Sequence, residues 1–254
     1  MRYTDYIFDL YGTLVDIHTD ENDTVWEKTA FYFGFHGAHY TPEELKELFT
    51  SKIRSREAHA GQNYECFPDI PFETVMEDLF LEKGISKNVE QLAFHGAQLF
   101  RIASLEYIRL YPEVKSVLSS LRDRGCRVWL LSNAQRVFTE YELRYLGLAE
   151  AFDGIYISSD HMYRKPDRRF FDALIQEQRL DRGKSIMIGN DRDTDIGGAK
   201  ASGLDTLYIH TDLTPTDQSA ADPERHPLLV PNAKHTEIEG WDPEIMARLP
   251  EIFQ

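Results

Sequence analysis

The chain has 254 residues, of which 42% are hydrophobic, enough to build a substantial core in one large domain or two modest ones. Its formal net charge of -15 disfavours nucleic acid as a partner, because an acidic protein repels phosphate backbones. Two cysteines predict neither a disulfide framework nor a zinc site, and the lack of a signal-peptide pattern or membrane-spanning stretch favours a cytoplasmic protein that contacts no membrane.

The first predicted element is a short apolar strand, Tyr6–Phe8, which leads into Asp9 and a turn that contains Gly12. Open α/β sheets place their functional sites at the carboxyl ends of parallel strands, which is where this acid stands. Considered alone, Asp9 is explained equally well as a solvated residue at the end of an ordinary strand. The rest of the chain decides between these interpretations.

Residues 17–107 have a helical pattern and lack the alternation of strands and helices seen later in the chain. We therefore expect a helical insertion here, between the core segments 1–16 and 108–254. Such an insertion lies over Asp9, where a lid excludes water and selects substrate; a separate helical domain without a catalytic role is the alternative. The expected helices begin at Pro42 and cover Phe72–Leu81 and Val89–Arg109, with a loop at Cys66–Pro71.

The second half of the chain alternates short apolar runs with helical patterns, which predicts an α/β fold built on a parallel sheet. A polar stretch, Thr211–Pro231, is interpreted as a surface excursion, and residues 235–254 are expected to hold a last strand and a short helix. Cys126 precedes the first run and is expected to be a core thiol. The strand-like runs are Arg127–Leu131, Gly154–Ile157, Ser185–Ile188 and Thr206–Ile209.

Polar side chains near two of these runs can bind an anion. Ser132 and Asn133 end the first run with a hydroxyl and an amide, although a Ser-Asn turn alone is more often structural. Lys165 precedes Pro166 at an expected helix start, so its ammonium adds to the positive field of a helix N-terminus. It can neutralise a carboxylate or phosphate and keep Asp9 ionised, whereas a lone lysine is usually solvated surface.

An acidic cluster follows the strand-like run Ser185–Ile188. Asp191, Asp193 and Asp195 lie close together in the chain and repel one another unless a cation or a base joins them. Their oxygens suit a hard ion such as Mg²⁺, which prefers a few carboxylates and waters. A solvated acidic loop is the alternative explanation.

Taken together, these strand ends resemble the motifs of the haloacid dehalogenase-like hydrolase superfamily. The resemblance covers the core in order and implies a Rossmann-like parallel-sheet core with a helical cap inserted after the first motif. The sequence of residues 17–107 resembles no specific cap. The matching residues are Asp9 with Gly12-Thr13, Ser132-Asn133, Lys165-Pro166, Gly189-Asn190-Asp191 with Asp195, and also Tyr111-Pro112 and Ala151-Phe152-Asp153.

The resemblance implies a catalytic role for several of these residues. Asp9 is the nucleophile that attacks the substrate and forms a covalent intermediate, which splits one difficult step into two. Ser132 and Lys165 hold the anionic group that is transferred or hydrolysed. Thr13 and Asn133 are further candidates for binding the substrate.

The resemblance also implies a magnesium site. Asp191 binds Mg²⁺ together with Asp9, and Asp195 contributes through a water molecule. The backbone carbonyl of Tyr11 completes the set, and any side chain at that position leaves this carbonyl available.

Tyr11 departs from the pattern of the superfamily phosphatases, which usually carry a second Asp there to protonate the leaving oxygen and activate water. A tyrosine with its ordinary pKa of about 10 is a weak acid and a poor base near neutral pH. General acid–base assistance is worth about 10²–10⁴-fold. A phosphatase that lacks it should be slow, or limited to substrates with good leaving groups.

The Asp-x-Tyr-Gly-Thr form is instead typical of 2-haloacid dehalogenases, in which the nucleophile displaces halide without a metal. Those enzymes usually carry a cap arginine in the region that corresponds to residues 35–40, and no arginine occurs there. Arg54 and Arg56 lie further on and are better explained as solvated helix residues. The last dehalogenase motif also usually has a Ser-x-Asn arrangement where this chain has acids.

We weight the acidic cluster above Tyr11 and expect a Mg²⁺-dependent phosphatase that acts on a small phosphorylated metabolite through an aspartyl-phosphate intermediate. One alternative is a metal-independent 2-haloacid dehalogenase, and another is a weakly active or non-catalytic protein that binds a phosphorylated ligand. The expected partner is a small anionic molecule, and neither its identity nor the oligomeric state follows from the sequence. Candidate pocket residues in the insertion are Arg54, Arg56, His59 and Tyr64.

Overall fold

A six-stranded parallel sheet forms the centre of the computed structural model, which describes residues 2–59, 66–215 and 234–249. The strand order is β5-β4-β1-β6-β7-β8, so β1 lies between β4 and β6. The predicted α/β fold and all five predicted strands are confirmed. The strands are β1 (Asp5–Phe8), β4 (Arg127–Ser132), β5 (Gly154–Ile157), β6 (Ser185–Gly189), β7 (Asp205–His210) and β8 (His235–Glu239).

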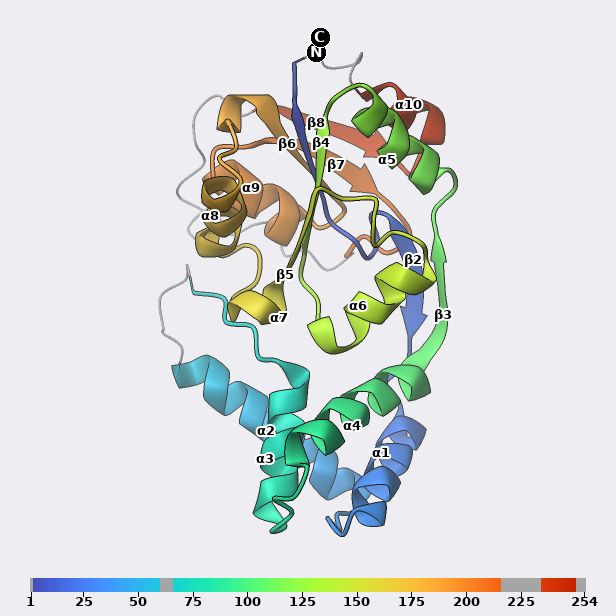
Figure 1. The fold of residues 1–254 in the computed structure, drawn as a ribbon, viewed down its shortest axis with the longest axis vertical. Coiled ribbons are helices and arrows are strands. Elements are labelled where there is room, and N and C mark those ends of the chain that lie inside the picture. Colours follow the sequence, from blue (N-terminus) through green and yellow to red (C-terminus); the bar gives the residue numbers. More distant parts are fainter. Residues whose placement is uncertain (1, 60–65, 216–233, 250–254) are drawn as a thin grey trace.

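Helices cover both faces of this sheet, which explains why its central strands are mostly apolar (Figure 1). Successive side chains of a strand point to opposite faces. Ile7 therefore packs against α8 (Arg168–Glu177) and α9 (Gly198–Ala201). Its neighbours Tyr6 and Phe8 share a core with α5 (Val114–Asp123), and α10 (Pro243–Ala247) completes that side. The buried Cys126 belongs to the same core, as expected.

The other four large helices form a separate group at one end of the molecule (Figure 1). Their core is aromatic: Phe33 stacks on Phe80 with ring centroids 4.0 Å apart, and Trp26 contacts Phe100 edge-on at 5.0 Å. The predicted loop at Cys66–Pro71 is confirmed. The helices are α1 (Asp23–Phe35), α2 (Pro42–His59), α3 (Phe72–Glu82) and α4 (Val89–Ser104), and no helix among the described residues is long and apolar enough to cross a membrane.

Two strands that we did not predict connect this group to the sheet. β2 (Val15–Thr19) and β3 (Leu105–Leu110) pair in an antiparallel ribbon. The prediction of a helix from Val89 to Arg109 is therefore wrong at its end, because α4 stops at Ser104. Tyr and Ile in β3 favour a strand, and the deciding contact is a partner strand far away in the chain.

The carboxyl ends of the parallel strands face the helical group. Between them lie α6 (Arg136–Tyr145) and the short α7 (Ser158–His161) (Figure 1). The loop before α3 docks on the core there, since the Arg164 N–H donates to the Phe67 carbonyl and the Asp69 N–H to that of Met162. The expected last strand and short helix are confirmed as β8 and α10. Of the stretch 211–231, only residues 211–215 are described.

Candidate active site

Asp9 directly follows β1, the strand between β4 and β6. Its backbone N–H donates to the Ile188 carbonyl, which continues the ladder with β6, and its side chain is nearly buried. The Thr13 hydroxyl lies 3.3 Å from Asp9 Oδ2 and 3.2 Å from Asn190 Oδ1. Asp9 is therefore not a freely solvated strand end.

The turn after Asp9 depends on a glycine. Gly12 has a φ of 81°, and a Cβ there would lie 2.2 Å from Asn190 Nδ2. Only glycine combines this left-handed conformation with so close an approach. Asn190, which directly follows β6, thus supports the turn. Asn190 is one of the residues that carry the family resemblance, but its contact with the turn was not predicted.

Lys165 is a buried cation at this edge of the sheet, with 1% of its surface exposed. Its Nζ donates to Asp9 Oδ1 at 2.7 Å, to Asp195 Oδ1 at 2.6 Å and to the Leu131 carbonyl at 2.8 Å. These bonds use all three hydrogens of the ammonium group. Lys165 therefore offsets the charge of Asp195, one of the three clustered acids, together with that of Asp9.

The chain around Lys165 is held by polar contacts. Asp167 caps α8 by accepting from the Arg169 N–H, so Lys165 precedes a helix start as predicted. Asn133 accepts from the Lys165 N–H at 2.8 Å and donates to its carbonyl at 3.0 Å. In this structure Asn133 therefore positions Lys165, and its expected contact with substrate stays a prediction.

Asp195 approaches the end of β6 closely enough to require a glycine there. A Cβ on Gly189 would lie 2.2 Å from Asp195 Oδ2, and this oxygen accepts from the Asp191 N–H at 3.0 Å. Burial raises the pKa of Asp195, and the ammonium of Lys165 opposes that shift. Burial alone would lower the pKa of Lys165, but the two carboxylates raise it above its usual value. The proton of the ammonium is thus firmly held.

Ser132 is fully buried, and its Oγ has no hydrogen-bond partner within the described residues. Buried hydroxyls are normally paired, because an unmade bond costs about 1–3 kcal/mol. This hydroxyl directly follows Leu131, whose carbonyl accepts from Lys165. Its expected contact with an anionic oxygen of the substrate stays a prediction.

A metal site at this edge stays a prediction. Within the ranges that the structure describes, no group of three or more His, Cys, Asp or Glu side chains could hold an ion. Asp191 Oδ1 caps the helical turn η2 (Arg192–Gly197) by accepting from the Asp193 and Thr194 N–H groups. Mg²⁺ commonly takes only one or two protein carboxylates and fills its shell with water and phosphate. Asp9, Asp191 and the Tyr11 carbonyl are donors of the right kind, while Asp195 is engaged by Lys165.

Tyr11 directs its hydroxyl to α6. The hydroxyl donates to Glu142 Oε2 at 2.5 Å and lies 2.9 Å from Thr139 Oγ1. Burial, and then the charge of Glu142, raise the pKa of Tyr11 well above its ordinary value. Tyr11 is consequently neutral, with its proton committed to Glu142. Neither Glu142 nor its second partner Arg101 was identified from the sequence.

Two of the candidate pocket residues of the helical group, Arg54 and Arg56, have contacts or neighbours within that group. Arg56 donates to Asp78 Oδ2 at 2.7 Å and so connects α2 to α3. Arg54 is exposed on α2 and lines a separate hollow with Asp23 and Lys46. His59 ends α2, and Tyr64 lies outside the described residues.

Residues 6–203 match the model of the haloacid dehalogenase-like hydrolase family. Among curated proteins, glyceraldehyde 3-phosphate phosphatase of Methanothermobacter thermautotrophicus is 24% identical over 72% of this chain and 75% of its own length. (S)-2-haloacid dehalogenase 1 of a Pseudomonas species is 26% identical over 87% of this chain and 90% of its own. A 2-haloacid dehalogenase structure from Pseudomonas syringae covers 98% of this chain and 97% of its own, with a TM-score of 0.64 at 18% identity, which shows a shared fold.

Proposed function

The chain belongs to the haloacid dehalogenase-like hydrolases, and on that premise we propose that it hydrolyses small phosphate monoesters with Asp9 as the nucleophile. The observation that carries this proposal is the buried Ser132 hydroxyl, left unpartnered among the described residues beside the Lys165 contacts. A phosphate oxygen satisfies that hydroxyl. The relationship to a glyceraldehyde 3-phosphate phosphatase supports the same substrate class.

The proposed reaction has two steps. An Asp9 oxygen bonds to phosphorus while the bond to the ester oxygen breaks, which gives an aspartyl phosphate and an alkoxide or aryloxide that takes a proton from water. Water then attacks the phosphorus, which releases phosphate and restores the Asp9 carboxylate. Lys165 holds Asp9 in place and offsets its charge, and the Ser132 hydroxyl donates to a phosphoryl oxygen.

Magnesium is part of the proposal as a cofactor. Asp9, Asp191 and the Tyr11 carbonyl would hold it, and when bound it supplies positive charge that offsets the phosphoryl oxygens. Lys165 supplies a further positive charge, at Asp9 Oδ1.

The position of Tyr11 constrains which phosphate esters react well. Its proton is bonded to Glu142, so it does not reach a leaving oxygen. The proposed enzyme therefore favours esters whose alcohols leave without a proton, such as aryl phosphates. We further propose that residues 17–107 act as a cap that covers Asp9 and excludes water.

Dehalogenation is the second candidate, and Tyr11 is the observation that favours it. Halide needs no proton when it leaves, so an Asp9 attack on carbon requires no acid at position 11. The alignment with (S)-2-haloacid dehalogenase 1 covers most of both chains. Hydrolysis of the resulting ester restores Asp9 and releases a hydroxy acid.

Parallel assays separate these proposals. We expect phosphate release from an aryl phosphate in Mg²⁺, lost in EDTA and in Asp9→Asn, and no halide release from a 2-haloacid. Halide release that persists in EDTA would assign the second candidate. Thermal stabilisation by inorganic phosphate without turnover of either substrate would assign a binding protein and overturn both.

A further inference from the structure

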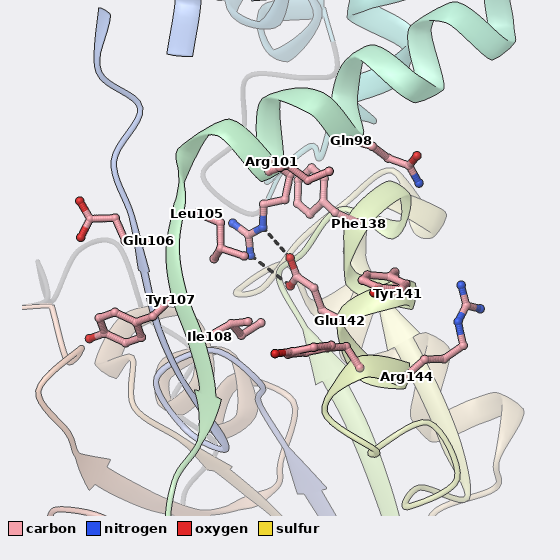
Figure 2. A pocket seen from close by; sticks show the side chains of 12 residues that line it. Gln98, Arg101, Leu105, Glu106, Tyr107, Ile108, Phe138, Tyr141, Glu142 and Arg144 are labelled. Carbon is pink, nitrogen blue, oxygen red and sulfur yellow. Dashed lines mark hydrogen bonds and ion pairs between the residues drawn. The ribbon is translucent and has the colours of Figure 1, made fainter. Parts of the chain in front are cut away.

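Three charged or polar side chains from distant segments meet between the sheet and the helical group. Arg101 Nε donates to Glu142 Oε1 at 2.6 Å and Arg101 Nη2 to Glu142 Oε2 at 3.1 Å (Figure 2). The Tyr11 hydroxyl donates to the same Oε2. Glu142 thus contacts both the helical group, through Arg101 of α4, and the turn after Asp9, through Tyr11.

Most of this contact is buried. The side chains of Arg101 and Glu142 are 15% and 6% exposed, and the Arg101 guanidinium also lies over the rings of Tyr11 and Phe138. A buried ion pair is costly to break by removing one partner, because the remaining charge stays buried without compensation. The contacts among these three side chains are therefore expected to form or break together.

The contact also lies where a small displacement has an effect at the nucleophile. Arg101 stands three residues before the end of α4, at the point where the chain enters β3. Tyr11 stands two residues after Asp9. A movement of α4 toward or away from α6 is therefore transmitted through Glu142 to the turn that holds Asp9.

The surroundings leave room for such a movement. A cavity of about 650 Å³ adjoins the Arg101–Glu142 pair on one side, and Phe138 and Tyr141 help to line it (Figure 2).

We propose that Tyr11, Glu142 and Arg101 form a coupling triad that sets the position of α4 relative to the Asp9 turn, so that Tyr11 is a positioning residue. The triad requires only the contacts described above. Its expected effect on turnover rests in addition on the proposed hydrolase function. Tyr11 in this role explains why a tyrosine stands beside the nucleophile although its proton does not reach the site.

Hydrogen exchange measured by mass spectrometry tests the coupling without any substrate. Tyr11→Phe removes one hydroxyl and Arg101→Met removes the guanidinium while keeping an unbranched side chain. Each is expected to raise exchange about 10-fold both in α4 and in residues 9–14, since a bond to a charged group is worth that much or more. Glu140→Gln is the matched control, because the exposed Glu140–Arg144 pair lies on the same helix.

Exchange that rises only in the mutated element, or equally in Glu140→Gln, would overturn the coupling triad. Catalysis gives a second readout. Tyr11→Phe should lower kcat about 10-fold with little change in KM for an aryl phosphate, and adding Arg101→Met should cause no further loss. Additive losses contradict the proposal. A wild-type protein without turnover would refute the hydrolase function while the exchange result still decides the coupling.

Discussion

The carboxyl edge of the sheet and the helical group bury different kinds of side chain. The sheet edge buries charges, and Lys165 pairs there with both Asp9 and Asp195. The helical group buries aromatic rings, with Phe33 and Phe80 stacked at its centre. Buried charge confers reactivity and aromatic packing confers shape, so changes to the two regions should be separable by experiment.

The largest separation is expected from Asp9→Asn. The amide is isosteric but is no nucleophile, so turnover of an aryl phosphate should fall to the uncatalysed background. Urea unfolding should show a loss far smaller than the effect on rate, because Lys165 keeps Asp195 and the Leu131 carbonyl. Substantial remaining turnover would exclude Asp9 as the nucleophile.

Lys165→Met should damage both stability and activity. It leaves two buried carboxylates without a cation, and the loss of one partner from a buried ion pair costs about 3–5 kcal/mol. Lys52→Met is a matched control, because Lys52 pairs with Glu82 nearer the surface and should cost at most about 1 kcal/mol. Equal urea midpoints for the two variants would show that the buried pairing of Lys165 stabilises the fold no more than the more exposed pair of Lys52 and Glu82.

Phe80→Ala should lower the stability of the protein much more than its catalytic rate, the reverse of Asp9→Asn. Removing a fully buried ring that stacks on Phe33 should cost about 3 kcal/mol and loosen the helical group. Since Phe80 does not belong to the sheet edge, kcat below the unfolding temperature should fall far less than in Asp9→Asn, and by no more than in Tyr11→Phe. Phe31→Ala, at an exposed position of α1, is the control and should be nearly neutral. Loss of kcat without loss of stability would contradict the division between the regions.

Ser132→Ala should have the smallest effect on the stability of the fold. Its hydroxyl has no partner among the described residues, so its removal should leave stability unchanged or raise it by about 1 kcal/mol. Turnover should fall about 10-fold or more, because a donor to the phosphoryl oxygens is lost. Destabilisation by this variant would show that the hydroxyl serves the fold, and unchanged turnover would remove it from the proposed site.

The parts of the fold that could be predicted are those whose signal is local. The strands β1, β4 and β6 are buried on both faces, so each is an uninterrupted apolar run. Because parallel strands end at one edge, the residues that follow them could be grouped in advance. The end of α4 could not be placed, since the pairing of β3 with β2 depends on a partner far away in the chain.

The contacts of Tyr11 lay beyond prediction for a related reason. On α6, Glu140 and Glu142 look alike in the sequence, and only the fold turns one outward and the other inward. The role of Lys165 was anticipated, but its contact with Asp195 was not. That contact changes the argument for a metal, because a lysine already offsets the charge of these acids.

The ribbon of β2 and β3 has a further consequence for the architecture. Thr19 and Leu105 are paired, so the chain leaves the core and returns to it at neighbouring points. A short reverse turn is enough to close two paired antiparallel strands. The 85 residues or so between them can therefore be exchanged for a shorter or different insert without rerouting either strand. Because of this ribbon, a segment of another shape could replace the helical group while the carboxyl edge of the sheet stays unchanged.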